Sequence, residues 1–117
     1  MDESRPIFQQ IAEQIENDII SGALPEETQV PSTNELAAYL RINPATAGKG
    51  VNLLVDSGTL YKKRGIGMFV ADGARARLVA QRRDQFREQY VTPLLTEAEK
   101  LGITPAQLAT MIGEAGR

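Results

Sequence analysis

The sequence contains neither cysteine nor histidine, and both absences exclude classes of chemistry. Without cysteine the chain can form no disulfide, thiolate nucleophile or cysteine-ligated metal site. Without histidine it lacks the commonest general base and the commonest transition-metal ligand. We therefore expect neither an enzyme nor a metal or cofactor site.

Long apolar runs are missing as well. No stretch approaches the roughly 20 apolar residues that span a bilayer, and residues 1–6 do not open a basic segment followed by an apolar run, as a secretory signal would. We therefore expect a cytoplasmic protein. The 117 residues, 42% hydrophobic and 24% charged, suit one folded domain with a short appendage.

The net charge is -2, but charge is distributed unevenly along the chain. Residues 1–40 carry eight acidic side chains and one basic one, whereas residues 41–70 carry five basic and one acidic. Residues 71–117 are nearly balanced, with seven basic and six acidic. Such asymmetry is typical of a polyanion-binding face on an acidic protein, although chance clustering on a solvated surface gives the same pattern.

Isoleucines at strict four-residue spacing predict an amphipathic helix over residues 4–20. Its polar face is acidic, so we do not expect this helix to face phosphate. Ser21 and Gly22 end the helix, and an irregular loop is expected over residues 23–30.

Two further helices are predicted from their caps. Ser32 and Glu35 stand three residues apart, in the capping-box pattern of a short second helix. Asn43–Pro44 then supplies the N-cap and the first residue of a third helix, which Gly58 ends. Two short helices joined by a tight turn are typical of a helix-turn-helix.

The third helix contains two glycines, and a hairpin follows it. Gly48 and Gly50 indicate either close helix packing or a bare backbone that lets a partner surface approach, and both explanations stay open. Residues 60–63 and 68–71 are predicted to form two strands, joined by a basic turn with two glycines.

In this order the elements resemble the winged helix-turn-helix of GntR-type bacterial transcription regulators. The resemblance covers about residues 6–71 and rests on short motifs in sequence: Pro6-Ile7, Ser21-Gly22, Pro31-Ser32, Glu35-Leu36-Ala37, Asn43-Pro44 with Thr46, Asp56-Ser57-Gly58 with Leu60, and Arg64-Gly65-Ile66-Gly67-Met68-Phe69-Val70. The Asn-Pro start and the short tail resemble the YtrA-type subgroup. The implied fold is mainly α with a small β-hairpin: a winged helix-turn-helix DNA-binding domain over 1–73 and a two-helix dimerisation tail over 74–117.

The resemblance implies that the third helix enters the major groove of double-stranded DNA and that the hairpin reaches the minor groove. The helical residues expected to bind DNA are Ser32, Thr33, Asn34, Asn43, Ala45, Thr46 and Lys49. Those in the wing are Lys62, Lys63, Arg64, Gly65, Ile66 and Gly67. Capping alone also explains Ser32 and Asn43. Many GntR proteins carry arginine where Asn34 stands and another in the recognition helix near Gly48, and both are absent here, so fewer bidentate guanine contacts are expected.

The tail carries an apolar stripe from residue 74 to about 101, interrupted at Thr92–Pro93, where we expect a kink or break. Thr104 begins a final helix. Two helices have little core of their own, so the stripe must be buried on the first domain or on a second copy of the chain, and we favour the second copy. The expected dimer-interface residues are Val79, Phe86, Tyr90, Leu94, Leu101, Leu108, Met111 and Ile112.

These features predict a homodimeric, sequence-specific DNA-binding transcriptional repressor that reads an inverted repeat, with half-sites roughly 34 Å apart or slightly more. The alternative is a winged-helix module whose basic face binds an acidic protein surface. The resemblance also implies a small-molecule effector in a pocket between the tail and the winged domain, which no residue in the sequence identifies.

Overall fold

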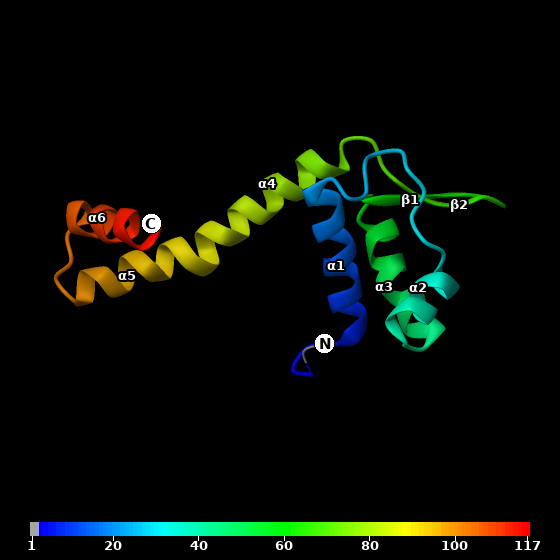
Figure 1. The fold of residues 1–117 in the computed structure, drawn as a ribbon, viewed down its shortest axis with the longest axis horizontal. Coiled ribbons are helices and arrows are strands. Elements are labelled where there is room, and N and C mark those ends of the chain that lie inside the picture. Colours follow the sequence, from blue (N-terminus) through cyan, green and yellow to red (C-terminus); the bar gives the residue numbers. More distant parts are fainter. Residues whose placement is uncertain (1–2) are drawn as a thin grey trace. The chain divides into compact units, whose positions relative to one another are not determined.

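The computed structural model describes residues 3–117 and is mainly helical, with one antiparallel hairpin (Figure 1). Residue contacts divide the chain within one helix into two units, the first ending at Val79 and the second running from Ala80 to Arg117. In the described part of the chain, no helix is both long and apolar enough to cross a membrane. The expected fold class is confirmed, whereas the functional boundary after residue 73 stays a prediction.

The first unit contains three complete helices and the hairpin: α1 (Ile7–Ser21), α2 (Thr33–Leu40), α3 (Pro44–Asp56), β1 (Leu60–Lys63) and β2 (Gly67–Val70). α1 begins directly after Pro6, three residues later than predicted. It ends at Gly22, whose left-handed conformation (φ 88°) costs glycine little. The isoleucine stripe of α1 is buried except at Ile7, which remains exposed at the first turn.

Both helices of the predicted helix-turn-helix begin at the caps that the sequence indicates. The Ser32 hydroxyl accepts a hydrogen bond from the Glu35 amide (3.1 Å), and the Glu35 carboxylate accepts one from the Ser32 amide (3.2 Å). The Asn43 side-chain oxygen accepts a hydrogen bond from the Ala45 amide (2.7 Å) and caps α3. Between the helices, Arg41 adopts a left-handed conformation (φ 56°) that ends α2.

The core of the first unit lies between α1 and α3 and continues to the strands and to the start of α4 (Ala74–Phe86). Its buried members are Ile11, Ala12, Ile15, Ile19, Val30, Val51, Leu54, Leu60, Val70, Ala74 and Leu78. Because the inner face of α3 is held by this core, the opposite face of the helix is exposed and has a fixed orientation in the unit.

Gly50 marks the closest approach between α1 and α3. A Cβ atom there would lie 2.8 Å from the Phe8 carbonyl oxygen and 3.1 Å from two side-chain carbons of Ile11, so no side chain fits without a shift. A Cβ atom at Gly48 would lie 3.5 Å from Cγ2 of Thr33, which is an ordinary contact. Close packing therefore explains Gly50, whereas Gly48 lies beside α2 with room for a methyl group.

The hairpin is confirmed, with β2 one residue earlier than predicted. The loop before α2, expected to be irregular, also pairs with it. Residues 27–30 lie beside β2, where the Glu27 amide donates to the Val70 carbonyl (2.8 Å) and the Val30 amide to the Met68 carbonyl (2.9 Å). The hairpin is thus tied to the chain that leads into α2.

The first turn of α4 is fixed to the first unit by polar contacts. The Glu26 carboxylate accepts a hydrogen bond from the Arg75 amide (3.2 Å). Hydrogen bonds from the Gly73 and Arg75 amides hold the pKa of Glu26 below its usual value, because they favour the charged carboxylate. Arg75 Nε donates to the Ile20 carbonyl (2.9 Å) near the end of α1. A loop carboxylate and a helix end therefore secure the start of the tail.

The second unit contains the rest of α4 and then η1 (Arg87–Val91), α5 (Thr92–Lys100) and α6 (Pro105–Ala115). η1 is a π-helical turn in which the Thr92 amide donates to the Arg87 carbonyl, five residues earlier. Pro93 follows directly, and its missing N–H and bulky ring disfavour ordinary helical hydrogen bonding there. The interruption expected at Thr92–Pro93 is therefore a widened turn just before the proline. The Thr104 cap of α6 is confirmed.

We predict that Gly50→Ala destabilises the fold by up to about 2 kcal/mol, because overpacking at the α1–α3 contact costs about 1–3 kcal/mol and alanine recovers only roughly 1 kcal/mol of it over glycine in a helix. Gly48→Ala is the matched control in the same helix, and it should leave stability unchanged or raise it by up to about 1 kcal/mol. Urea unfolding measures both variants. Equal effects would contradict the packing role of Gly50.

We also predict that the stabilisation by Glu26 depends on pH. Its pKa is lowered in the folded state, so the carboxylate stabilises the fold above the ordinary pKa of about 4.5, and this stabilisation is lost as the pH falls through the lower folded value. Glu26→Gln should melt below the parent chain near neutral pH, and the difference should shrink below about pH 4. Glu114→Gln, at an exposed position in α6, is the control. Thermal melts across this range would contradict the account if the difference stayed constant.

Candidate nucleic-acid interface

The start of α2 presents three of the predicted site residues. Ser32 and Asn34 are exposed, whereas Thr33 is half-buried and places its methyl group against α3. The Ser32 hydroxyl oxygen accepts the Glu35 amide in the capping box. A hydroxyl also donates, so Ser32 can cap the helix and still donate to an acceptor such as a phosphate oxygen.

The exposed side chains of α3 recur at helical spacing. Ala45, Lys49 and Asn52 are exposed and stand four and three residues apart, on the face opposite the core, and Thr46 is half-buried beside them. The side-chain oxygen of Asn43 is used by the cap, which leaves its NH₂ group to donate. The sequence analysis missed Asn52, although its place one turn beyond Lys49 is the signal that identifies it.

The tip of the hairpin is exposed and cationic. Lys62 and Arg64 are exposed, and Ile66 exposes 63% of its surface. Gly65 turns the chain with a positive φ of 79°. Figure 1 shows the hairpin projecting from the helices of the first unit. A thin tip with an arginine suits a narrow minor groove, where the negative potential favours that side chain.

Gln29 supports this tip and was not found from the sequence. Its side-chain amide donates to the Ile66 carbonyl (3.0 Å). Gly67 has a φ of 145°, a conformation that other residues rarely adopt, and a Cβ atom there would lie 2.5 Å from Gln29 Nε2, so a side chain would also displace the glutamine amide. The two partners are 37 residues apart in the chain, and no local pattern signals such a contact.

Two of the site lysines lie over aromatic rings. Lys49 Nζ lies 4.1 Å from the centre of the Phe8 ring. Lys63 Nζ lies 4.4 Å from the centre of the Phe69 ring, which stacks on Tyr61 with 5.9 Å between ring centres. A cation over a ring face is attracted by the negative electrostatic potential of the π system. Both lysines therefore have preferred positions although they are exposed.

One carboxylate lies at the base of the hairpin. The Tyr61 hydroxyl donates to the Glu27 carboxylate, and this hydrogen bond raises the pKa of Tyr61 because ionisation would place two negative charges together. Tyr61 thus remains a neutral donor at physiological pH. The contact holds the Glu27 side chain against β1.

The arrangement as a whole has the chemistry of a polyanion-binding surface. The N-terminal turns of α2 and α3 contribute hydroxyl and amide groups, while α3 and the hairpin contribute cations, all within the first unit. Lysine, arginine, serine, threonine and asparagine are the side chains that proteins use to hold phosphates and to read base edges.

The predicted dimer-interface residues are mostly exposed in the single chain. The exposed members are Phe86, Tyr90, Leu94, Leu101, Met111 and Ile112. Val79 is half-buried, and Leu108 is buried together with Ala98. Leu95, which the sequence analysis did not name, is 50% exposed and adds to the apolar surface of α5. Leu108 thus differs from the rest, because the tail of one chain already covers it.

The sequence matches the family described as "Bacterial regulatory proteins, gntR family" over residues 7–70, which include α1 to α3 and the hairpin. The HTH-type transcriptional repressor YtrA of Bacillus subtilis (strain 168) is 29% identical over 111 residues, which cover 95% of this chain and 85% of YtrA.

Two solved structures show the same likeness. A GntR family transcriptional regulator from Listeria monocytogenes has a TM-score of 0.76 and 26% identity, covering 97% of this chain and 98% of its own. The DNA-binding domain of AraR, solved in complex with operator ORX1, has a TM-score of 0.56 and 32% identity, covering 61% of this chain and 87% of its own. This chain therefore belongs to the GntR family of bacterial regulatory proteins, as its motifs indicated.

Proposed function

We propose that this chain is a homodimeric transcriptional regulator that represses its target genes by binding an inverted repeat in double-stranded DNA. The observation that carries the proposal is the exposed face of α3, flanked by the start of α2 and a cationic hairpin, in a chain whose net charge is -2. The relatives support it: YtrA is named a transcriptional repressor, and the AraR DNA-binding domain was solved with its operator.

In the proposed complex, the N-terminal half of α3 enters the major groove. Ala45 and Thr46 lie in its first turn, where a methyl group can contact thymine and a hydroxyl can bond to a base or a phosphate. Lys49 donates to guanine or to phosphate, and Asn52 lies one turn further on the same face. Since neither Asn34 nor Gly48 supplies a guanidinium group, we expect few bidentate guanine contacts in the complex.

The flanking elements hold the DNA backbone. Ser32, Asn34 and the first amides of α2 face phosphate, since helix N-termini present donors to anions. Arg64 and Ile66 at the hairpin tip enter the minor groove, where arginine reads groove width and an apolar side chain contacts the sugars and base edges. These contacts set orientation and general affinity, while α3 supplies most of the sequence preference.

The second unit supports dimerisation because it buries few of its own side chains. Of residues 80–117, Ala98 and Leu108 are buried. Large apolar side chains of the same unit are 43–65% exposed: Phe86, Tyr90, Leu94, Leu95, Leu101, Met111 and Ile112. Phe86, Tyr90 and Leu94 stand four residues apart, and exposed apolar side chains that gather on one face mark interaction sites. We propose that a second copy of the tail covers it and that the dimer thereby presents two α3 helices to one duplex.

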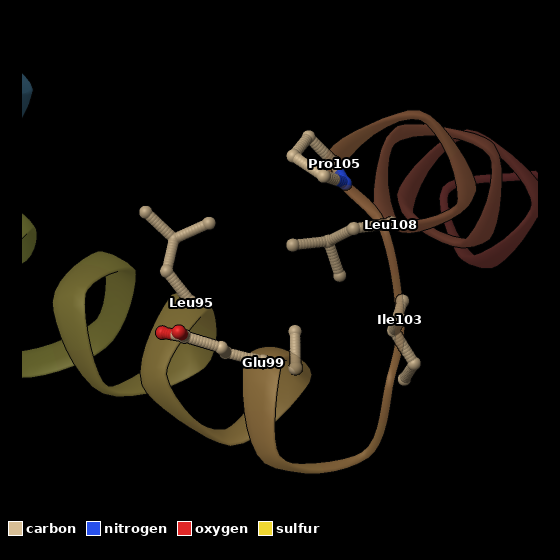
Figure 2. Close-up of a pocket in the computed structure, with 6 residues that line it drawn as sticks. Leu95, Glu99, Ile103, Pro105 and Leu108 are labelled. Atoms are coloured by element: carbon tan, nitrogen blue, oxygen red, sulfur yellow. The ribbon is translucent and has the colours of Figure 1, made fainter.

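An open pocket between α5 and α6 also supports a second copy of the tail as the partner (Figure 2). It has a volume of about 330 Å³ and is lined by Leu95, Ala98, Glu99, Ile103, Pro105 and Leu108. In Figure 2 the side chains of Leu95 and Leu108 approach the gap from the two helices. In a single chain the pocket residues Leu95 and Pro105 are exposed to water, whereas Ala98 and Leu108 are already buried, and apolar side chains of a second copy would cover the exposed ones.

We predict that the chain selects duplex sequences from a random pool and binds them with an affinity that falls about a thousandfold or more between roughly 50 and 200 mM salt, because several phosphates are neutralised. The combined change Lys49→Glu with Arg64→Glu should weaken binding at least about 100-fold while the dimer stays intact. Fluorescence anisotropy with the selected duplex measures both effects.

The matched control for this charge reversal is Lys100→Glu with Arg117→Glu, which makes the same change in charge on the tail. This pair should retain most of the affinity. If the two pairs weaken binding equally, net charge rather than the α3 and hairpin surface governs it. Unchanged affinity of the first pair would remove Lys49 and Arg64 from the site.

We predict that Tyr90→Asp with Leu94→Asp converts the dimer to a monomer, because each substitution places a charge where the apolar stripe meets the second copy. The dimer dissociation constant should rise at least about 100-fold. Light scattering should give twice 12.8 kDa for the parent chain and 12.8 kDa for the variant. Gln85→Asp, exposed but outside the four-residue spacing of the stripe, is the control and should stay dimeric. A monomeric parent chain would contradict the proposal.

A further inference from the structure

Lys49 is exposed, yet its ammonium group has a defined neighbour. Lys49 Nζ lies over the ring of Phe8, whose centre is 4.1 Å away. Phe8 belongs to the first turn of α1, and Lys49 lies in the middle of α3. Lys49, which belongs to the predicted DNA surface, is thus held by α1. The polar face of α1 is acidic, and we do not expect this helix to face DNA.

The contact follows from the close packing of the two helices. Gly50, the residue after Lys49, lets the α1 backbone approach until the Phe8 carbonyl oxygen lies 2.8 Å from where a Cβ atom would be. Phe8 is half-buried at this point, so its ring is fixed beside the exposed face of α3. The lysine beside it can lay its flexible stem and its ammonium group over that ring.

An aromatic partner differs from a carboxylate in its effect on charge. A carboxylate at the same place would hold the lysine but would cancel its charge, whereas a ring holds the cation and leaves its full charge to attract phosphate. The hairpin repeats the arrangement, because Lys63 lies over Phe69. The chain contains only three phenylalanines, and two of them lie under lysines of the candidate interface.

We propose that Phe8 is a positioning residue for DNA binding: its ring orders Lys49 before the DNA arrives, in the place where the ammonium group meets the duplex. A free lysine loses rotamer freedom when it binds, and a lysine already ordered by the ring loses less. α1 therefore contributes to affinity without touching DNA. This inference rests on the proposed docking of α3 in the major groove.

A double-mutant cycle with Phe8→Leu and Lys49→Gln in the full chain tests the proposal on the selected duplex, at a salt concentration where every variant still binds. With Lys49 present, Phe8→Leu should weaken binding about tenfold, roughly threefold for each half-site. With Lys49→Gln present, the same change should have little effect. Phe8→Tyr keeps a ring face under the lysine and should retain the parent affinity.

The cycle separates positioning from simple stabilisation of the fold. A structural role for Phe8 would weaken binding equally in both backgrounds, and that result would overturn the proposal. So would unchanged or tighter binding of Phe8→Leu with Lys49 present, because the ring would then be neutral or would compete with DNA for the lysine.

A second measurement does not depend on DNA. In the unbound protein, the Lys49 Cε protons should show an upfield ring-current shift in NMR spectra, which Phe8→Tyr keeps and Phe8→Leu removes. A parent chain without this shift would refute the contact itself. If the parent binds no duplex, the proposed function fails as well, whereas binding without coupling between the two residues overturns only the role of Phe8.

Discussion

The contact between α1 and α3 at Gly50 is the constraint on which the rest of the structure depends. It holds the inner face of α3 in the core, and the opposite face, with Ala45, Lys49 and Asn52, is then exposed in a fixed direction. The same approach brings the Phe8 ring under Lys49. A larger residue at position 50 would push α1 away from α3. It would then disturb both the orientation of the exposed α3 face and the contact between the Phe8 ring and Lys49.

An acidic chain can present a cationic surface when its charges are unevenly distributed: residues 1–40 carry eight acidic side chains and one basic one, whereas residues 41–70 carry five basic and one acidic. Hydrogen bonds from neutral donors fix the positions of three carboxylates without cancelling their charge: Glu35 in the α2 capping box, Glu26 at the start of α4 and Glu27 beside Tyr61. Lys49 and Lys63 of the interface lie over neutral rings. An aromatic ring positions a lysine without neutralising its positive charge, so the lysine can still attract a polyanion. A protein of net charge -2 can bind a polyanion through such a surface.

Local features of this fold could be read from the sequence because their physical causes are local. Helix caps such as Ser32, Asn43 and Thr104 involve residues within three positions of each other, and all three were predicted. Contacts between distant segments were not predictable in this way. Gln29 under the hairpin tip and Phe8 under Lys49 join residues that only the tertiary fold brings together. The role of Gly50 was left open, because one sequence does not reveal which face of the helix a glycine takes.

The central claim is that the exposed face of α3 and the hairpin tip together form the surface that binds duplex DNA. An amide chemical-shift titration of the full chain with its selected duplex tests it most directly. The account predicts the largest shifts over residues 43–49 and 63–67 and little change at the exposed residues Asn17 and Asp18 of α1. Shifts concentrated on α1, or spread evenly over the surface, would contradict it.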